Sequence, residues 1–581
     1  MDLVNIKING MPLSVPAGTT ILEAARQLGL EIPTLCHLKN VNEIGACRIC
    51  VVEVKGARSL VASCVYPVSE GMEVTTNSPR VLNARKKTLE LILSTHDRKC
   101  LSCVRSGKCE LQSLCHELGV EDEGKYDGEK KQYEQDRSSK HMVRDNNKCI
   151  LCRRCVAACR QQFVGVIGPN NRGFETSIGC AFEKQLSEVA CISCGQCIVS
   201  CPTGALSERD DTDRVFAALA DPTKHVVVQT APSIRATLGE CFGLPVGTNV
   251  EGKMVAALRR LGFDKVFDTD FGADLTIMEE ANEFVQRVQN GGKLPLITSC
   301  SPGWIKFCEM YHPELLENLS SCKSPQQMFG AVIKTWYAET NGIDPKDIVS
   351  VSVMPCTAKK FEVDRDDQSA AGVPDVDISI TTRELARMIE RASINFEMLP
   401  DEQFDNPLGE STGAGVIFGA TGGVMEAALR TAVETITGKE LDDVNFNAVR
   451  GTAPIKEATL NVGGMDVKVA VASGMSAAHV LLERVKNGEQ FHFIEIMGCP
   501  GGCVNGGGQP HQPASVRSFV DLKAKRAAAL YNDDTSKAIR KSHENPMIKR
   551  IYAEYFEKPG SHKAHEILHT SYVDRSKSTI K

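Results

Sequence analysis

The feature that most constrains this chain is the number and spacing of its cysteines. The chain has 581 residues, of which 24 are cysteines, and most of these stand close together in short clusters. A disulfide-linked scaffold would disperse them, and the N-terminus lacks the basic and apolar segments of a signal peptide. We therefore expect a reducing, cytoplasmic compartment, in which such clusters bind metal as iron–sulfur or zinc sites.

Composition narrows the possible partners. The formal net charge is −6, and no segment has the clustered Lys and Arg of a nucleic-acid-binding face, so we expect no nucleic acid partner. No run approaches the roughly 18 apolar residues that suggest a membrane span, so we expect no membrane association. The length predicts about four domains.

Residues 1–78 are predicted to form a β-grasp module. An alternating segment at residues 4–8 is followed by the turn dipeptide Asn9-Gly10, a second strand and a helix that ends near Gly29. Its cysteines resemble those of variant ferredoxin modules that bind a [2Fe–2S] cluster. A zinc ribbon is the alternative, but the unequal spacing argues against it. The expected ligands are Cys36, Cys47, Cys50 and Cys64.

Residues 79–138 carry a histidine followed by three cysteines. The pattern resembles the His-ligated [4Fe–4S] module in the large iron–sulfur subunit of respiratory complex I. A neutral imidazole in place of a thiolate makes a cluster less anionic, which should raise its reduction potential. Cys115 has no place in the pattern and is expected to be a buried thiol. The expected ligands are His96, Cys100, Cys103 and Cys109.

Residues 139–209 contain two runs with the spacing of bacterial two-cluster ferredoxins. In that pattern the fourth cysteine of each run ligates the other cluster. One [4Fe–4S] cluster is therefore expected to bind Cys149, Cys152, Cys155 and Cys201. The other is expected to bind Cys191, Cys194, Cys197 and Cys159. Together with the two earlier modules, these runs predict an electron-transfer chain of one [2Fe–2S] and three [4Fe–4S] clusters.

Residues 210–510 alternate strand-like apolar runs with helical segments, which predicts an α/β domain of two lobes with a cleft between them. In such sheets ligands bind at the carboxyl ends of the strands. Four of the strand-like runs end close to Ala231, Cys300, Cys356 and Cys499. Residues 511–581 are predicted to form a helical tail over this domain, and a metal site at the tail's histidines is the less favoured alternative.

Three motifs within residues 210–510 indicate a family. They are TSCSPGW at 298–304, MPCTAKKFE at 354–362 and EIMGCPGGCVNGGGQP at 495–510. In this order they resemble the signature of the iron-only, or [FeFe], hydrogenases, and the tail resembles that family's small subunit. The resemblance implies an H-cluster, in which a [4Fe–4S] cubane is joined through one cysteine to a di-iron unit with carbonyl, cyanide and bridging dithiolate ligands.

Matching to the family motifs implies roles within that site. Cys503 matches the cysteine that bridges the cubane and the di-iron unit, and Cys356 and Cys499 match two further cubane ligands. Lys359 matches a lysine that hydrogen-bonds a cyanide, where an ammonium beside an anionic ligand is electrostatically favourable. The matched pocket wall, which excludes water, consists of Ala231, Pro232, Ser233, Pro325, Gln326, Met354, Phe418 and Met497.

The chain departs from the family at Cys300-Ser301, where two cysteines are usual. Matched strictly, Cys300 relays protons and Ser301 stands in a ligand position, although a serine oxygen suits a cluster iron poorly. Alternatively, Cys300 is the cubane ligand and Ser301 or water carries the proton, or the centre itself is altered. We favour Cys300 as the ligand because thiolate is the better donor. Glu280, Glu283 and Ser320 match the remaining proton relay.

The resemblance implies an enzyme that interconverts H2 with protons and electrons. A sensory H2-binding protein and a non-catalytic electron-transfer subunit are the rival interpretations. The Cys-Ser motif and the long N-terminal wire look like the catalytic subunits of NAD(P)-linked, electron-bifurcating hydrogenases. We therefore expect ferredoxin and a flavin- and NAD(P)-binding subunit as partners, and maturation proteins that insert the di-iron unit. No Gly-rich dinucleotide motif is evident in this chain itself.

Overall fold

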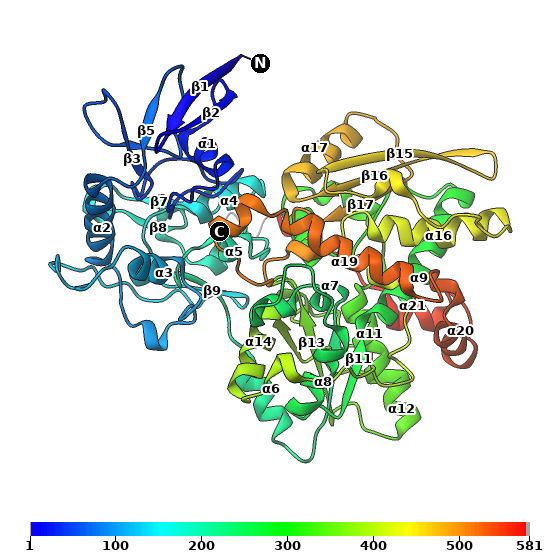
Figure 1. Ribbon diagram of the computed structural model, residues 1–581. Coiled ribbons are helices and arrows are strands. Elements are labelled where there is room, and N and C mark those ends of the chain that lie inside the picture. Colours follow the sequence, from blue (N-terminus) through cyan, green and yellow to red (C-terminus); the bar gives the residue numbers. More distant parts are fainter. Residues whose placement is uncertain (1, 577–581) are drawn as a thin grey trace.

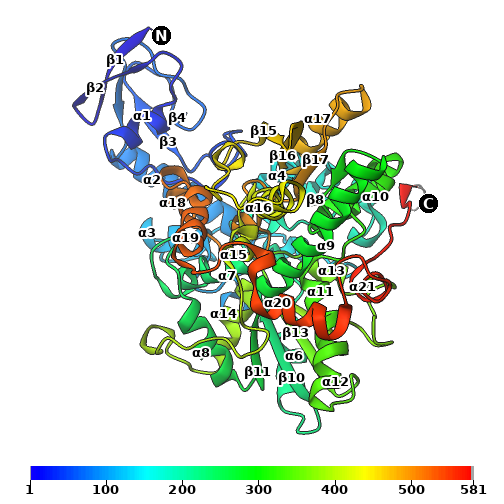
Figure 2. The same cartoon turned by 90° about the vertical axis from the view of Figure 1, so that its right-hand side faces the viewer.

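The computed structural model describes residues 2–576 (Figure 1). The N-terminal modules, in blue and cyan, lie beside a larger part that is built on two sheets, and the C-terminal segment, in orange and red, runs across that larger part (Figures 1 and 2). Among the described residues, no helix combines the length and the apolar character that crossing a membrane requires.

The first module is a five-stranded sheet in the order β2-β1-β5-β3-β4. Strands β1 and β2 form the predicted antiparallel hairpin, and the turn residues Asn9 and Gly10 have φ angles of 49° and 81°. Helix α1 begins after Thr20, whose hydroxyl accepts a hydrogen bond from the backbone N–H of Glu23 at 3.2 Å. The elements are β1 (Leu3–Ile8), β2 (Met11–Pro16), α1 (Ile21–Gln27), β3 (Val51–Val54), β4 (Val61–Ala62) and β5 (Glu73–Thr75).

The next two modules are mostly helix and loop. Helices α4 and α5 each follow a cysteine pair, pack against one another and begin after a residue with positive φ, Arg153 at 61° and Gly195 at 70°. This similarity reflects the two cysteine runs in the sequence. The elements are α2 (Pro79–Leu93), α3 (Glu110–Glu117), β6 (Met142–Arg144), α4 (Arg154–Gln161), β7 (Gly168–Asn170), β8 (Ser177–Gly179), α5 (Gln196–Ser200) and β9 (Leu206–Glu208).

The larger part contains two four-stranded sheets, as the two-lobe prediction requires. The first has the order β11-β10-β13-β14 and is parallel throughout. The second has the order β12-β17-β16-β15, in which only β15 is antiparallel to its neighbour. The strands are β10 (His225–Thr230), β11 (Lys265–Asp268), β12 (Leu296–Ile297), β13 (Ile348–Met354), β14 (Ile378–Thr381), β15 (Ile455–Val462), β16 (Met465–Ser473) and β17 (Phe493–Met497).

Helices cover both sheets, and α9 is the longest α-helix in the described part of the chain. It packs against α11, α15 and α16, and its residues are largely buried. The helices are α6 (Thr212–Leu219), α7 (Pro232–Arg235), α8 (Glu251–Leu261), α9 (Thr269–Asn290), α10 (Pro302–Tyr311), α11 (Pro325–Val332), α12 (Ala338–Asn341), α13 (Lys359–Glu362), α14 (Thr382–Arg391), α15 (Gly413–Val416), α16 (Gly423–Thr437) and α17 (Met475–Lys486).

The C-terminal segment packs across the larger part. Helix α19 contacts α7, α15 and the turn at residues 503–505, while α20 contacts α9 and α21 contacts α11 (Figure 2). The fully buried Arg430 of α16 donates two hydrogen bonds of 2.9 Å to the equally buried Asp534 of α19. The helices are α18 (Ala514–Phe519), α19 (Leu522–Ser536), α20 (Pro546–Ile551) and α21 (His562–Leu568).

Breaking this buried ion pair should loosen the C-terminal segment. The change Asp534→Asn leaves the buried Arg430 guanidinium with Glu426 as its remaining carboxylate partner, which Arg450 also shares. We therefore expect a loss of about 3 kcal/mol in unfolding free energy, the lower end for a broken buried pair, seen as a lower thermal midpoint. The control Glu554→Gln removes a solvent-exposed pair with Arg550, which water screens, so the thermal midpoint should hardly change. Equal midpoints for the two variants would contradict this role.

Candidate active site

One cavity lies where the carboxyl ends of β10, β12, β13 and β17 approach one another. Its volume, counted as the space open to the centre of a water-sized sphere, is about 80 Å³. The lining includes seven of the eight predicted wall residues, namely Ala231, Pro232, Pro325, Gln326, Met354, Phe418 and Met497. The eighth, Ser233, is fully buried behind the wall, where its hydroxyl accepts a hydrogen bond from Gln509 Nε2 at 3.3 Å.

The structure brings all the predicted cluster ligands of this site to the same cavity. Cys356, Cys499 and Cys503 line it together with Cys300 and Ser301. Burial raises the pKa of all four thiols, that of Cys503 to about 12, so each carries its proton until a metal displaces it. Three or four convergent cysteines in an otherwise apolar cavity suit a thiolate-bound iron–sulfur cluster, so the residues fit the implied group.

The glycines after Cys503 are explained by close backbone contacts. A Cβ atom on Gly506 would lie 2.2 Å from the carbonyl oxygen of Pro355, and one on Gly507 would lie 2.1 Å from that of Cys194. Only glycine allows both approaches. The loop at residues 498–508, which we call the glycine loop, therefore packs against the Cys356 motif on one side and the ferredoxin-like module on the other.

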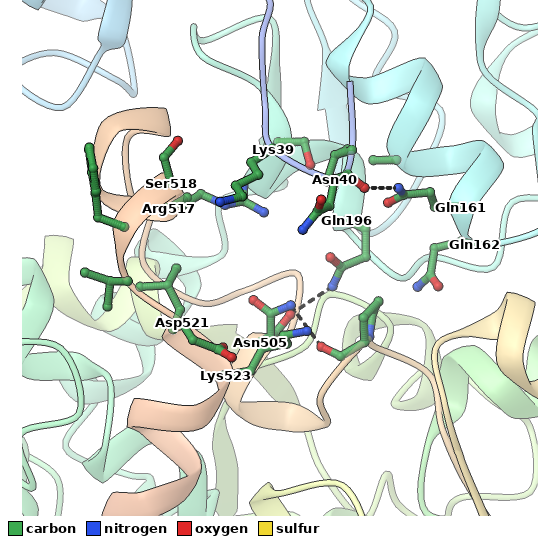
Figure 3. A pocket seen from close by; sticks show the side chains of 17 residues that line it. Lys39, Asn40, Gln161, Gln162, Gln196, Asn505, Arg517, Ser518, Asp521 and Lys523 are labelled. Atoms are coloured by element: carbon green, nitrogen blue, oxygen red, sulfur yellow. Dashed lines mark hydrogen bonds between the residues drawn. The ribbon is translucent and has the colours of Figure 1, made fainter. Parts of the chain in front are cut away.

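Glutamine side chains also fasten the ferredoxin-like module to the glycine loop. Gln162 Nε2 donates to the carbonyl oxygen of Gly498 at 2.8 Å, and Gln196 Nε2 donates to that of Asn505 at 2.9 Å. Figure 3 shows Gln161, Gln162, Gln196 and Asn505 around a polar pocket at this junction. The two parts are thus joined directly beside predicted ligands of both.

Lys359 lies in a compact hydrogen-bond network at the edge of the cavity. Its ammonium donates to Glu362 Oε2 and Ser324 Oγ, both at 2.8 Å, and to the carbonyl oxygen of Cys300 at 3.3 Å. Sequence reasoning assigned no role to Glu362 or Ser324. The three-residue separation of Lys359 and Glu362 on one helix was the available signal for the first, whereas nothing in the sequence pointed to Ser324.

Cys300 and Ser301 face different neighbours. Ser301 Oγ accepts a hydrogen bond from the backbone N–H of Gly498 at 3.1 Å, directly before Cys499. Cys300 packs with the hydrophobic cluster of α9 and α16, and after burial the charge of Glu280 is the largest influence that raises its pKa. These contacts place Ser301 toward the glycine loop and Cys300 toward the predicted proton relay, so they do not favour Cys300 over Ser301 as the cubane ligand.

The predicted relay residues lie together beside Cys300. Ser320 Oγ donates to Glu283 Oε2 at 2.9 Å, and Ser320 also hydrogen-bonds Glu280. Burial and then the charge of Glu283 raise the pKa of Glu280 to about 8. Arg287, one turn further along α9, donates to Glu283 Oε1 at 2.6 Å. Sequence reasoning missed Arg287, although its four-residue separation from Glu283 was a usable signal.

In the first module, the four predicted ligands form two close pairs. Cys36 N–H lies 3.3 Å from Cys47 Sγ and Cys47 N–H lies 3.4 Å from Cys36 Sγ, while the sulfurs of Cys50 and Cys64 are 3.3 Å apart. All four are free thiols. Four thiols in two pairs suit a cluster with two iron atoms.

In the second module, the predicted ligands line one cavity. His96 is buried, and its Nδ1 has no hydrogen-bond partner among the described residues. Burial lowers the pKa of His96 to about 4, so its ring is neutral, as a metal ligand must be. The lining includes His96, Cys100, Cys103, Cys109 and Cys115. Cys115 therefore lies closer to the predicted site than its pattern suggested.

In the third module, the predicted crossing of the ligand sets is reflected in the packing. One cavity is lined by Cys149, Cys152, Cys155 and Cys201. In the other set, the charges of Cys159, Cys191 and Cys194 act to raise the pKa of Cys197, after burial. The unassigned Cys180 is fully buried, and its sulfur accepts a contact of 3.7 Å from Arg144.

The predicted cluster sites form a branched path. Asn42 Nδ2 donates to the carbonyl oxygens of Cys36 and Cys152, at 2.8 and 3.0 Å, which joins the first module to the third. A Cβ on Gly204 would lie 2.7 Å from Cys103 Sγ, which brings the second module against the same part of the third. Both branches therefore meet near the Cys149 set, and the Cys191 set lies between it and the glycine loop.

Among the described residues, one histidine–carboxylate group, formed between α16 and the tail, has the spacing of a metal site. It consists of Glu434, His543 and Glu544. However, the ammonium of Lys541 lies 2.8 Å from Glu434 and 3.1 Å from Glu544. This ammonium already supplies a positive charge to both carboxylates, so the group is explained as an ion-pair cluster.

The His96 module offers a sharp test of ligand identity. The change His96→Cys replaces a neutral ligand by an anionic one. We therefore expect the [4Fe–4S] cluster of the second module to remain bound with a lower reduction potential, measured by EPR-monitored redox titration. The control Cys115→Ser should leave iron content and potential unchanged, although Cys115 lines the same cavity. Loss of iron in Cys115→Ser, with His96→Ala still loaded, would assign the ligand to Cys115.

Sequence profiles of known families match the chain in five places. Residues 224–507 match the C-terminal domain of the iron-only hydrogenase large subunit, and residues 520–575 match the iron hydrogenase small subunit. Residues 1–79 match a 2Fe-2S iron-sulfur cluster binding domain. Residues 85–123 match an iron-sulfur binding region of NADH-ubiquinone oxidoreductase G, and residues 148–205 match a 4Fe-4S dicluster domain.

Whole proteins match as well. The chain is 51% identical to the NADP-reducing hydrogenase subunit HndD of Solidesulfovibrio fructosivorans, over 99% of this chain and 100% of that protein. It is 47% identical to iron hydrogenase 1 of Clostridium pasteurianum, over 98% and 99%. The solved apo [FeFe]-hydrogenase HydA1 from Chlamydomonas reinhardtii superimposes with a TM-score of 0.57 at 43% identity, covering 63% of this chain and 99% of that one. The chain therefore belongs to the iron-only, or [FeFe], hydrogenases, and it carries iron–sulfur electron-relay domains ahead of the hydrogenase domain.

Proposed function

We propose that this hydrogenase interconverts H2 with protons and electrons in the cavity beside the glycine loop, with Cys356, Cys499 and Cys503 as the ligands of an H-cluster. The observation that carries the assignment is the convergence of these three thiols and the ammonium of Lys359 around one apolar cavity, which Cys300 also lines. When bound, the di-iron unit supplies the metal centre at which H2 is formed or split.

The chain's own residues then provide positioning and proton transfer. Lys359, held by Ser324 and Glu362, would supply a positive charge and a hydrogen-bond donor to a cyanide ligand of the group. Apolar walls formed by Phe418, Met354 and Met497 exclude water from the cavity. Cys300 holds a proton at Sγ and exchanges it with the carboxyl of Glu280, because its thiol is buried beside that group. Ser301 stands in the ligand position, next to the glycine loop.

From Glu280, protons pass to Glu283 through the hydroxyl of Ser320. Ser320 hydrogen-bonds both carboxyls, so it can accept a proton from one and donate its own to the other. Because the pKa of Glu280 is about 8, this carboxyl is neutral at neutral pH and can act as a donor.

Electron relay through the N-terminal modules completes the proposal. The chain divides into five parts, at residues 1–78, 79–138, 139–209, 210–510 and 511–581. The first three parts bind one [2Fe–2S] and three [4Fe–4S] clusters. Each cluster is held by the cysteines, and in the second module also the histidine, that the spacing in the sequence predicts. The contacts of Asn42 with two predicted ligand residues, and of Cys194 with Gly507, support a continuous path to the glycine loop.

Partner subunits are proposed from the relatives. HndD is a subunit of an NADP-reducing hydrogenase, and this chain matches it over its whole length. We therefore infer a flavin- and NAD(P)-binding partner that docks at the first or second module, and ferredoxin as a further electron carrier. If hydrogenase activity linked to NADH copurifies from the host with this single chain alone, the partner is excluded.

Infrared spectroscopy of the anaerobic, matured protein tests the central assignment. Bands in the carbonyl and cyanide stretching region that shift when H2 is added are expected. A protein whose accessory clusters are full but that lacks such bands would be an electron carrier. Shifting bands combined with negligible turnover would instead support the sensory alternative, which the serine at position 301 suggests as a rival to the enzyme.

Substitution at Cys300 distinguishes its two possible roles. If Cys300 transfers protons, Cys300→Ala should retain iron content and infrared bands but lose activity by a factor of about 10²–10⁴, the usual range for a proton-transfer group. The matched change Ser301→Cys should restore a thiolate ligand and leave the relay intact. Loss of the cubane EPR signal in Cys300→Ala would assign Cys300 as the ligand.

The pH dependence follows from Glu280. Its carboxyl is protonated below about pH 8 and ionised above it, so the donor form is lost as the pH rises through this value. We expect H2 production, measured at a constant driving force relative to the proton/H2 couple, to decline above about pH 8. Glu280→Gln, which is neutral but cannot release a proton, should be slow at every pH. A flat parent profile from pH 6 to 9 would contradict this assignment.

A further inference from the structure

A histidine of the C-terminal segment reaches the proposed proton relay. His569 directly follows α21, which lies next to α9 and α11 (Figure 2). Its Nδ1 lies 2.8 Å from Ser321 Oγ, and its Nε2 lies 3.1 Å from Glu279 Oε2. Ser321 Oγ in turn lies 3.4 Å from Glu283 Oε2, and the Ser321 N–H donates to the same oxygen at 3.1 Å.

Backbone pairing holds this histidine in place. Residues 322 and 569 form an antiparallel β-bridge. The N–H of Lys323 donates to the carbonyl oxygen of Leu568 at 2.9 Å, and that of Thr570 donates to the carbonyl oxygen of Ser321 at 2.8 Å. The segment that carries His569 is therefore fixed to the segment that carries Ser320 and Ser321.

The buried carboxylate of Glu279 orients the imidazole. Glu279 is fully buried, and it also accepts hydrogen bonds from the hydroxyl of Tyr552 at 2.5 Å and from the N–H of Gly560 at 2.9 Å. With Nε2–H donating to Glu279, the Nδ1 of His569 faces Ser321 and can gain or lose the exchangeable proton. A carboxylate that orients a histidine toward a hydroxyl is the arrangement used in general acid–base catalysis.

The other neighbour of Glu283 cannot carry protons in this way. Arg287 pairs with Glu283 Oε1, but a guanidinium stays protonated in proteins and does not exchange protons near neutral pH. The ring of the exposed His565, one turn before His569, lies beside it with centroids 4.1 Å apart and the planes tilted by 41°. His569 itself is 7% exposed at the side chain. Solvent is therefore close to the imidazole, and it also reaches part of Glu283, whose side chain is 16% exposed.

We propose that His569, oriented by Glu279, exchanges protons between solvent and Glu283 through the hydroxyl of Ser321, so that the C-terminal segment supplies an additional outlet of the proton relay. This inference rests on the proposed relay through Glu280, Ser320 and Glu283. In the inward direction, Nδ1–H gives its proton to Ser321 Oγ, whose own proton moves to Glu283 Oε2. The neutral imidazole then takes a proton from solvent, so one proton enters for each proton that is passed on.

His569 is surrounded by charged groups on two helices and by neutral buried side chains. Glu279 and Glu283 of α9 are acidic, and α21, which His569 follows, carries the basic residues His562, Lys563 and His565 and the acidic Glu566. The tyrosines and the thiol around the site are neutral, because burial raises the pKa of each, and they are Tyr552, Tyr572 and Cys322.

The test uses the matured holoenzyme and His569→Gln. Glutamine can hydrogen-bond both Glu279 and Ser321 but cannot take up a proton. We expect the rate of H2 production to fall roughly tenfold, less than the factor of 10²–10⁴ typical of a sole proton-transfer group, because Glu283 keeps 16% of its side chain exposed. Imidazole added to the buffer should restore part of the rate, and the infrared bands and the KM for the electron donor should not change.

Matched variants separate this role from a structural one. His562→Gln removes a histidine of the same helix that is 90% exposed and outside the network, so it should have no effect. Ser321→Ala should slow the enzyme as His569→Gln does, whereas Ser321→Thr keeps the hydroxyl and should restore the rate.

Two results would overturn the inference, and they can be told apart. If His569→Gln and Ser321→Ala match the parent while Glu283→Gln is slow, the relay holds but does not use His569. If Glu283→Gln and Glu280→Gln also match the parent, the relay through the two glutamates is itself wrong.

Discussion

The structure depends on how closely the glycine loop approaches its two neighbours. A single added Cβ at Gly507 would overlap the carbonyl oxygen of Cys194, and one at Gly506 would overlap that of Pro355. This contact places predicted ligands of the ferredoxin-like module directly beside the catalytic cavity. Electron transfer weakens steeply with distance, so a chain of cluster sites serves an enzyme only if its last member lies against the active site. The glycines at 506 and 507 allow this close contact because they lack a Cβ atom.

Charge distribution explains why the C-terminal segment belongs to the same unit. Arg430 of α16 and Asp534 of α19 are both buried, and such a pair is costly to separate because either partner alone would be a desolvated charge. Arg235, also fully buried, lies 3.1 Å from Asp533 and so adds a second tie to the same helix. These pairs fix α19 over the turn that contains Cys503, and they anchor the segment that continues to His569.

The sequence was sufficient where chemistry requires particular residues at fixed spacing. The cysteine runs, the hairpin at Asn9-Gly10 and the four strands that end at motifs could all be predicted, because each rests on local geometry. Contacts between distant segments could not. Asn42 reaches Cys152 across 110 residues, and Ser321 reaches His569 across 248, and no local pattern marks either pair. The Cys300-Ser301 question also needed the fold, since only packing shows which side chain faces Glu280.

Electrons and protons must reach the same cavity without sharing a route. The iron–sulfur modules approach it from the side of α4 and α5, whereas α9 and α21 lie on the other side of the cavity's domain (Figure 1). The electron side is built from thiols and closely approaching backbone, as at Gly507 and Cys194. The proton side is built from carboxyls, hydroxyls and a histidine, whose protons can move along hydrogen bonds. Because a proton route needs exchangeable groups that end at solvent, a mobile-proton residue such as His569 suits the outer end of this side better than the permanently charged Arg287.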